Sequence, residues 1–319
     1  MATIVQTTGV TAAPQTYLNK QFYDRNLLEM AKTKFVYANH GQKRTIPKGN
    51  GKKVEFRRWT PFEVDVENLT LTEGVTPDGQ NLAQTKLEVE CKQYGAYVEV
   101  SDLLEKTSFD NIAMGATDML GDQLGTLLDW IVRDAMCTTT NVQYANGKTS
   151  KAAVAAADKL TVDEIRKAVR TLKKGKARYF GGGRKPHFIC ICSPDATYDL
   201  QSDPLWQDVS KYSNAEQIYS GELGRLFGVV FVESTEAKVE AGAGSDSADL
   251  HHTLVFGADS YGLVDIDGGG HIQSIIKGLG ESGYDPLNQR ATYGAKIPAF
   301  AAAVLNNDWI IDLVHGVSA

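Results

Sequence analysis

Two alternating stretches, KVEFRRW at Lys53–Trp59 and KLEVECKQYGAYVEV at Lys86–Val100, decide how this sequence can fold. Val54 and Phe56 lie on one face of the first, and Leu87, Val89 and Cys91 alternate with charged residues in the second, which predicts two strands. The segment between them, Thr60–Thr85, contains turn signals and a further alternating run. Because an isolated hairpin is only marginally stable in water, a projecting excursion of this length indicates a partner surface.

The strongest helical pattern follows this excursion, from Ser108 to Cys137, where apolar residues recur every three or four positions. Before the excursion, Asn19–Lys34 has a shorter helical pattern that needs a surface to dock on. Proline and glycines interrupt Gly41–Lys53, which is therefore expected to be an exposed connection. After the long helix, Thr138–Ala157 is polar and is expected to be a loop near a domain boundary.

The rest of the chain alternates helix and strand patterns, so the fold class is α+β. Thr161 and Glu164 form a capping box that begins a helix, and Gly175 ends it. Ser193 and Pro194 begin another helix as N-cap and first-turn residues. Strands are expected at His187–Cys192, Leu226–Val232, Thr253–Phe256, His271–Ile276 and within Tyr293–Val314.

Charge is divided unevenly along the 319 residues, whose formal net charge is −6. Residues 1–59 hold 11 basic and 3 acidic residues, whereas residues 60–100 hold 2 basic and 8 acidic ones. The overall balance argues against a dedicated nucleic-acid-reading domain, which is usually basic. A basic segment followed by an acidic one favours docking between copies of the chain. A solvated arm and single-strand binding by stacking remain the alternatives.

A glycine-rich motif, GLGESG at Gly278–Gly283, matches the dinucleotide fingerprint G-x-G-x-x-G. That fingerprint must open a helix after a strand, and Pro286 disfavours a helix start here. A second candidate, Gly147–Thr149, lacks the earlier glycine of a phosphate-binding loop. A nucleotide-dependent enzyme built on the first motif is therefore retained only as a minor alternative.

Side chains that could hold a metal or act in catalysis do not form a recognised pattern in the sequence. The four cysteines are too few for a disulfide scaffold, and Cys190 and Cys192 on one strand are expected to be buried thiols. No histidine pair has zinc-site spacing. Asp265 and Asp267 are expected to lie at a solvated strand edge. We therefore predict no catalytic, cofactor-binding or metal-binding residues, and no secretory or membrane-spanning segment.

Several short motifs, in their order and spacing, resemble those of the major capsid proteins of tailed bacteriophages. More narrowly, the chain is similar to the capsid family typified by coliphage N-four. The motifs are LTEGVTP at 71–77, QYGAY at 93–97, GELG at 221–224, FGVVF at 227–231, DPLNQR at 285–290 and YGAK at 293–296.

This resemblance implies a Hong Kong 97-type capsid fold with a set division of the chain. Residues 1–50 would be the N-terminal arm and residues 51–98 the extended loop, or E-loop, that lies over a neighbouring subunit. Residues 99–144 would form the peripheral domain with its spine helix. Residues 145–285 would form the axial domain, and residues 286–319 would return to the peripheral domain.

The function implied by the resemblance is structural. Copies would assemble into pentamers and hexamers that close an icosahedral head around double-stranded DNA, which they contact non-specifically. The protein would be made in the host cytoplasm and reside in the virion capsid, with portal, scaffolding and decoration proteins as potential partners, and with no membrane or cofactor. An encapsulin-like cargo shell is the alternative within the same fold. The lysine-free segment 60–85 predicts no lysine–asparagine crosslinking.

The charge division also predicts which side chains meet between subunits. Acidic residues of the E-loop are expected to contact basic groups of a neighbouring copy, and Arg57 and Arg58 at the loop base are their candidate partners. The acidic residues are Glu63, Asp65, Glu67, Glu73 and Asp78.

Overall fold

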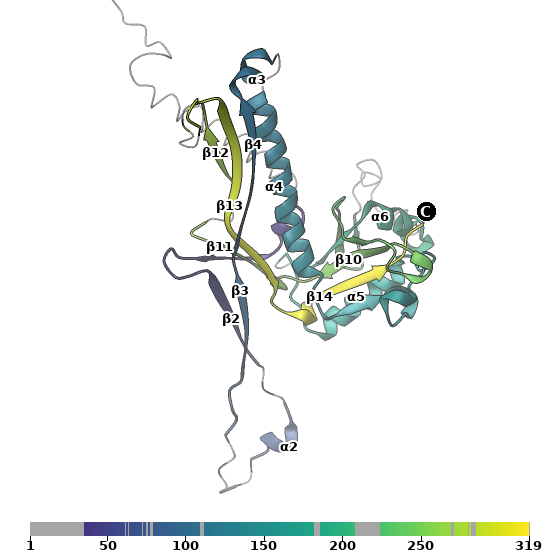
Figure 1. Cartoon of the computed structure of the whole chain (residues 1–319). Coiled ribbons are helices and arrows are strands. Elements are labelled where there is room, and N and C mark those ends of the chain that lie inside the picture. Colours follow the sequence, from purple (N-terminus) through teal and green to yellow (C-terminus); the bar gives the residue numbers. More distant parts are fainter. Residues whose placement is uncertain are drawn as a thin grey trace, which may run out of the picture.

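The computed structural model describes two sheets, a long helix and a projecting hairpin (Figure 1). The helix expected at Asn19–Lys34 lies outside the described residues. Within the described part, no helix is long and apolar enough to cross a membrane. The described residues are 35–60, 62, 64–71, 73–74, 76, 79–108, 112–181, 186–207, 224–268, 271–279, 281 and 285–318.

The five-stranded sheet is built around its longest strand, β13 (Arg290–Val304). β4 (Lys92–Ser101) and β12 (Gln273–Lys277) pair antiparallel with the first part of β13, and β11 (Tyr261–Ile266) pairs with its last residues. β1 (Gln42–Ile46) adds to β11 in parallel. The strands of this sheet therefore come from three separated stretches of sequence, residues 42–46, 92–101 and 261–304.

Two predictions about β1 and β11 are wrong. Gln42–Ile46 is a strand rather than an exposed connection, because its backbone pairs with β11 although most of its side chains are exposed. Asp265 is not at a sheet edge, because β11 is paired on both sides, opposite Thr45 and Phe300. Asp267 begins the turn after β11, with a positive φ of 52°.

The long helix α4 (Ile112–Met136) confirms the prediction from the apolar periodicity. Leu120, Leu124, Leu128 and Val132 recur every fourth residue and are all buried. They share one core with strands of both sheets, so α4 links the two sheets. A short helix, α3 (Asp102–Thr107), precedes it, and Ser101 is the N-cap of α3.

The seven-stranded sheet contains the predicted strands of the α/β region and two features that were not expected. A short strand, β5 (Val142–Tyr144), lies within Thr138–Ala157, which was expected to be a loop. Leu226–Val232 is not one strand, because Phe227 and Gly228 have positive φ values of 50° and 80° and form a tight turn between two strands. The order is β5 (Val142–Tyr144), β14 (Ile310–His315), β10 (Leu250–Phe256), β6 (Phe188–Cys192), β8 (Val229–Glu233) and β7 (Arg225–Leu226), with β9 (Val239–Glu240) pairing β10.

Two helices cover one face of this sheet, and both begin as predicted. The hydroxyl of Thr161 accepts the backbone N–H of Glu164 at the start of α5 (Val162–Lys174). The hydroxyl of Ser193 accepts the N–H of Ala196 at 3.2 Å, at the start of α6 (Pro194–Ser202). The opposite face of the sheet packs against α4. The sheet is therefore buried on both sides.

The hairpin of β2 (Lys53–Trp59) and β3 (Gln84–Glu90) confirms the predicted two-stranded excursion. It extends away from both sheets, with the short helix α2 (Val66–Leu69) near its far end (Figure 1). At its base, the half-buried Phe56 packs into a small core with β11 and β13. The hairpin is thus anchored at one end only.

Candidate assembly interface

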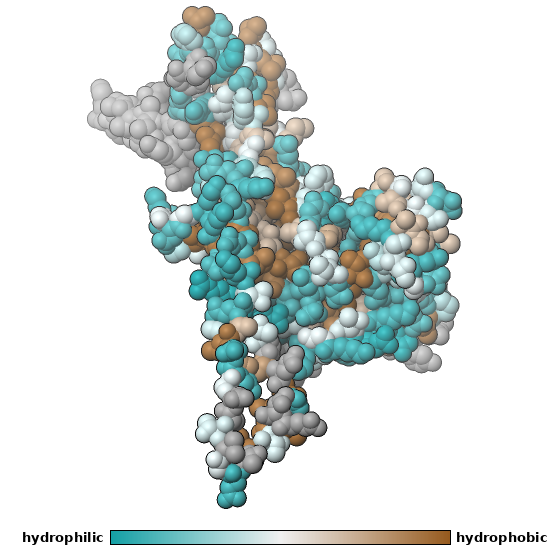
Figure 2. All heavy atoms as spheres, turned by 60° about the horizontal axis from the view of Figure 1, so that its bottom comes forward, coloured by the Kyte–Doolittle hydropathy of each residue, from teal (hydrophilic) through white to brown (hydrophobic). Residues whose placement is uncertain are grey.

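The outer part of the hairpin exposes an unusual number of large apolar side chains. Val64, Val66 and Leu71 are 87%, 77% and 71% exposed. Figure 2 shows brown, hydrophobic side chains along this projection. Monomeric soluble proteins rarely expose apolar surface in this way, so the feature is typical of an interaction site. The exposed apolar residues here are Trp59, Phe62, Val64, Val66, Leu69, Leu71 and Leu82.

The backbone of the hairpin gives the same indication. Its ladder runs from Lys53 opposite Glu90 to Trp59 opposite Gln84, and one more hydrogen bond joins Thr60 N to Ala83 O at 3.0 Å. The ladder has only two strands over this whole length. A two-stranded ribbon presents unpaired N–H and C=O groups on both edges, which another chain can satisfy.

Arg57 and Arg58, the predicted basic partners, both lie at the hairpin base on β2 and line one cleft of about 860 Å³. The Arg57 guanidinium donates to Glu55 on the same strand, with Nε 3.1 Å from Oε1. This hydrogen bond raises the pKa of Arg57 and lowers the pKa of Glu55. Arg58 is exposed.

The same cleft gathers further basic side chains from distant parts of the chain. Arg44 comes from β1, Lys86 from β3, and Arg178 from the segment after α5. Arg178 donates to Asp259 at 3.2 Å and its guanidinium lies 5.6 Å from the ring centre of Trp309. The cleft therefore presents several cations within reach of an acidic partner.

The predicted acidic residues are less fully described. Asp65 and Glu73 are exposed in the outer part of the hairpin, and Asp65 has an interaction within the chain. Glu67 lies in α2. Glu63 and Asp78 lie outside the described residues.

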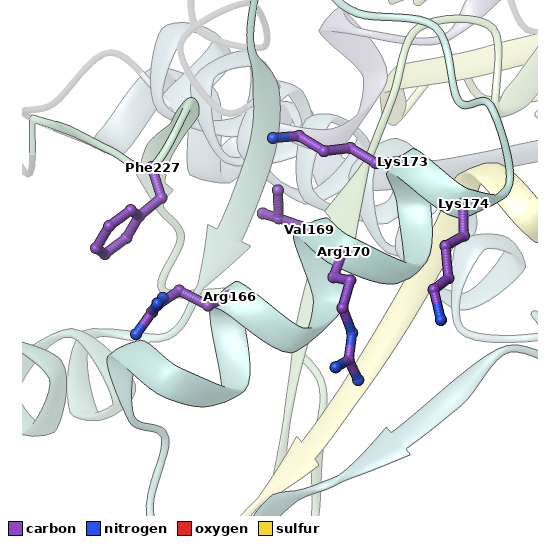
Figure 3. Close-up of a pocket in the computed structure, with 6 residues that line it drawn as sticks. All are labelled: Arg166, Val169, Arg170, Lys173, Lys174 and Phe227. Carbon is purple, nitrogen blue, oxygen red and sulfur yellow. The ribbon is translucent and has the colours of Figure 1, made fainter.

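A second basic surface, the α5 groove, was missed in the sequence. Arg166 and Arg170 and the adjacent Lys173 and Lys174 line a groove of about 510 Å³ together with Phe227 (Figure 3). The Arg166 guanidinium lies 5.3 Å from the Phe227 ring centre, at the tight turn between β7 and β8. The signal was the run of seven basic residues between positions 166 and 178, whose spacing places several on one helix face.

A buried carboxylate on α4, Asp129, was also missed. Its Oδ1 accepts the backbone N–H groups of Val36, Tyr37 and Ala38 at 3.1, 2.8 and 3.1 Å. Burial raises the pKa of Asp129 to about 6, against the lowering effect of these hydrogen bonds. The contact fastens the first described residues to the long helix. The sequence did contain a signal for this buried carboxylate, because Asp129 is an acidic residue within the apolar stripe of α4.

The glycine motif does not have the geometry of a nucleotide site. β12 ends at Lys277, and Gly278 O accepts the N–H of Glu281 at 3.1 Å in a turn. The carboxylate of Asp285 then accepts the N–H groups of Leu287 and Gln289 ahead of β13. In the parts of this stretch that are described, a turn stands where a dinucleotide site would need a helix.

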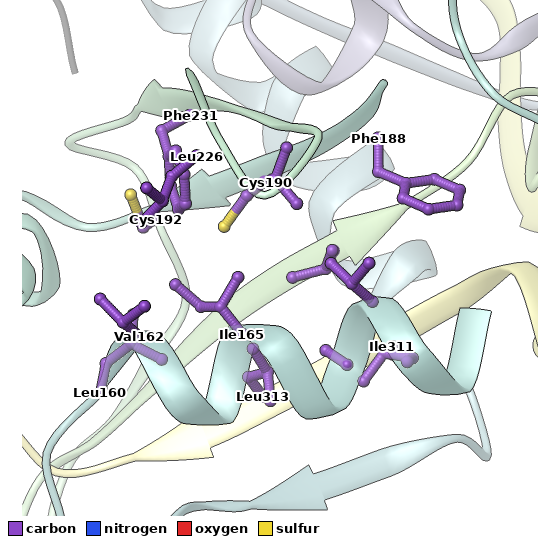
Figure 4. Packing of buried hydrophobic residues seen from close by; sticks show 14 of the residues in the cluster. Leu160, Val162, Ile165, Phe188, Cys190, Cys192, Leu226, Phe231, Ile311 and Leu313 are labelled. Atoms are coloured by element: carbon purple, nitrogen blue, oxygen red, sulfur yellow. The ribbon is translucent and has the colours of Figure 1, made fainter. Parts of the chain in front are cut away.

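Cys190 and Cys192 are buried in the apolar core between α5 and the seven-stranded sheet (Figure 4). Both side chains are 0% exposed. Their surroundings are those of structural thiols, as expected from the sequence.

Comparison with known proteins gives one family and a consistent group of structures. The family model described as "Phage capsid protein" matches residues 78–265. No curated protein matches the chain.

Three solved structures illustrate the similarity. The capsid of Ralstonia phage GP4 is 17% identical with a TM-score of 0.65, covering 88% of this chain and 87% of its own. The capsid asymmetric unit of cyanophage Pam1 is 15% identical with a TM-score of 0.69, covering 100% and 95%. A virus-like particle from Pyrococcus furiosus is 10% identical with a TM-score of 0.51, covering 92% and 99%.

Proposed function

The chain belongs to the phage capsid protein family, and from this premise we propose that it assembles into pentamers and hexamers of an icosahedral head enclosing double-stranded DNA. It is a structural major capsid protein with the Hong Kong 97-type fold, and not an enzyme. The observation that carries the assembly proposal is the apolar hairpin, which is exposed among the residues that the structure describes.

Covering this hairpin by a neighbouring copy would supply much of the association energy. Each large apolar side chain that becomes fully buried contributes about 1.5–3 kcal/mol. Val64, Val66 and Leu71 are more than two-thirds exposed and would gain most. The two-stranded backbone could also pair with an edge of the neighbour.

We further propose that the cleft at the hairpin base receives acidic side chains of another subunit. Arg57 and Arg58 would be its central cations, supported by the neighbouring basic side chains described above. Charge pairs of this kind fix orientation and specificity more than they add affinity. The acidic candidates are Glu63, Asp65, Glu67, Glu73 and Asp78.

The division into capsid domains is also a proposal. We assign α4 and the five-stranded sheet to the peripheral domain and the seven-stranded sheet to the axial domain. On this assignment β11 and β12 join the peripheral domain although they precede residue 286, and β14 joins the axial domain although it follows it. Residues 1–50 remain the proposed N-terminal arm, which on this assignment adds β1 to the peripheral sheet. Residues 51–98 remain the proposed E-loop, whose end overlaps β4.

Non-specific contact with packaged DNA is proposed for the α5 groove. Its four basic side chains have no acidic residue among the described residues that line it, and phosphate contacts need only closely spaced cations. An encapsulin-like cargo shell is the alternative. The match to the phage capsid protein family supports the DNA-filled head.

Narrower points remain proposals too. We propose membership of the family typified by coliphage N-four, synthesis in the host cytoplasm, and contacts with portal, scaffolding and decoration proteins. Lysine–asparagine crosslinking is not proposed for the E-loop, because residues 60–85 contain no lysine. Denaturing gels of assembled particles would show a ladder of linked subunits if such crosslinks formed.

The assembly proposal is tested by electron microscopy and sedimentation of the purified chain. We expect shells or capsomers from the wild type, and their loss from the double variant Arg57→Glu/Arg58→Glu. The matched control is Lys173→Glu/Lys174→Glu, which makes the same charge change on α5 and should still assemble. Monomeric wild type would refute assembly, whereas normal particles from the Arg57/Arg58 variant would refute only the proposed charge pairing. Absence of nucleic acid from native particles would favour the cargo shell.

A further inference from the structure

Three side chains that can bind a metal meet where α4 reaches the seven-stranded sheet. Cys137 directly follows α4, His252 lies in β10 and Asp312 lies in β14. One possible ligand atom from each lies within 4.8 Å of the other two. His252 and Asp312 are 2% and 1% exposed, and Cys137 is partly buried.

The strand register explains why these residues meet. β10 and β14 are antiparallel neighbours in which His252 pairs with Val314 and Leu254 with Asp312. His252 and Asp312 are therefore diagonal neighbours whose side chains point to the same face. Leu254, two residues after His252, packs in the core that includes α4, so this is the face next to Cys137.

The hydrogen bonding of His252 is incomplete when its imidazole is neutral. Its Nδ1 lies 2.7 Å from Oδ2 of Asp312, and its Nε2 lies 3.4 Å from Oε1 of Glu240. A neutral imidazole carries one N–H, so one of its two nitrogens would face a carboxylate oxygen without a proton between them. Among the described residues, His252 Nε2 and Asp312 Oδ1 have no hydrogen-bond partner. Buried polar atoms of this kind usually mark a missing proton, water or ion.

We propose that Cys137, His252 and Asp312 bind a zinc ion. A thiolate, an imidazole and a carboxylate form a donor set that zinc accepts, whereas calcium and magnesium prefer oxygen ligands alone. With His252 bound through Nδ1, its Nε2–H would donate to Glu240, the usual carboxylate support of a metal-binding histidine. Glu240 is itself held by Lys151, whose Nζ lies 2.8 Å from both of its oxygens.

Zinc binding requires the three ligand atoms, which lie within 4.8 Å of one another, to adjust their spacing. Tetrahedral ligand atoms at zinc bond lengths stand roughly 3.3–3.7 Å apart, so the 2.7 Å contact between Nδ1 and Oδ2 must open by about half an ångström. The thiol of Cys137 would lose its proton to solvent as zinc binds. Cys137 is the least buried of the three residues, so the ion would enter from its side, and a water would serve as fourth ligand. The ion would fasten the end of α4 to two central strands.

The test uses the full chain, dialysed against a chelator and titrated with zinc chloride in a calorimeter, with bound zinc then measured by elemental analysis. We expect one zinc per chain and a higher thermal unfolding midpoint with zinc. Cys137→Ser should abolish both effects, and Glu240→Gln should weaken binding about 10–100-fold. The matched control is Cys91→Ser, a buried cysteine outside the cluster, which should bind zinc normally.

Two results would overturn the proposal. One is a wild type that binds no zinc, as expected if His252 is instead a protonated imidazolium between two carboxylates. The other is equal binding by Cys137→Ser, which would indicate adsorption elsewhere. If that variant does not fold, cobalt replaces zinc in the wild type, and the lack of a thiolate-to-cobalt absorption band would refute the site. None of these outcomes depends on capsid assembly.

Discussion

Replacing Asp129 by alanine should be among the most damaging single changes in the long helix. The substitution leaves three backbone N–H groups, those of Val36, Tyr37 and Ala38, without their acceptor. A buried donor without a partner costs about 1–3 kcal/mol. Only Tyr37 is fully buried, and water can reach the other two. We therefore expect the free energy of unfolding at about pH 4, where the folded protein keeps this carboxyl protonated, to fall by about 3 kcal/mol rather than by the full cost of three such donors.

The same carboxylate should give the wild type a characteristic pH dependence. Burial raises the pKa of Asp129 from 3.8 to about 6, so the folded protein holds this proton more tightly than the unfolded chain does. The stability gained from this tighter proton binding is fully present below pH 3.8 and is lost as the pH rises through 6. The loss amounts to about 3 kcal/mol. Asp129→Asn cannot titrate but keeps an acceptor oxygen, so it should lose this pH dependence without the cost of the alanine variant.

Urea unfolding of the unassembled chain, followed by tryptophan fluorescence, measures both effects. Wild type, Asp129→Ala and Asp129→Asn are compared from about pH 4 to about pH 7, the range in which this carboxylate changes charge. Asp122→Asn, which replaces an exposed acid on the same helix, is the control and should behave as the wild type. The reasoning is refuted if, at about pH 4, the alanine variant loses less than about 1 kcal/mol relative to the wild type. It is also refuted if Asp129→Asn keeps the wild-type pH slope.

Three further predictions concern other parts of the molecule. Burial lowers the pKa of His315 to about 4, so the folded state resists its protonation and stability should fall as the pH drops from 6.5 towards 4. His315→Gln should flatten that slope in urea unfolding, and an unchanged slope would contradict the assignment. Gly257→Ala would place a methyl group against the backbone oxygen of Arg178, and it should lower the free energy of unfolding by about 2 kcal/mol or more. The methyl group of Gly278→Ala would meet nothing within 4 Å, so this variant should lose less than about 0.5 kcal/mol. Equal unfolding midpoints would refute this contrast. Lys173→Gln should make the slope of log DNA affinity against log salt concentration shallower by about 0.9, as measured by fluorescence anisotropy. An unchanged slope would show that Lys173 does not contact DNA.

Local sequence patterns were sufficient for the elements whose side chains alternate or recur regularly. The apolar spacing of 108–137 predicted α4, and alternation in 53–59 predicted β2. β1 could not be found in this way, because three of its five side chains are exposed and its partner, β11, lies far along the chain. The turn at Phe227–Gly228 was hidden because a bulky residue adopts a positive φ there.

The candidate sites differ in how far neighbouring residues in the sequence could predict them. Arg57 and Arg58 stand out in a basic run, and the basic spacing on α5 was equally visible although it was not used. The partners of Asp129 are about 90 residues away in sequence, and those of His252 come from three other elements. Such clusters depend on which strands become neighbours, and a single sequence does not determine that pairing.

The distribution of buried side chains separates a rigid body from an adaptable projection. One core contains Leu128 of α4, Phe300 of the five-stranded sheet and Phe256 of the seven-stranded sheet, so the two sheets cannot move independently without opening it. The hairpin contributes only its base to a core, through Val54, Phe56 and Val89. A shell built from pentamers and hexamers requires one chain to fit neighbours at slightly different angles. The structure can meet this requirement by bending the two-stranded ribbon, because among the described residues no buried packing beyond its base resists the movement.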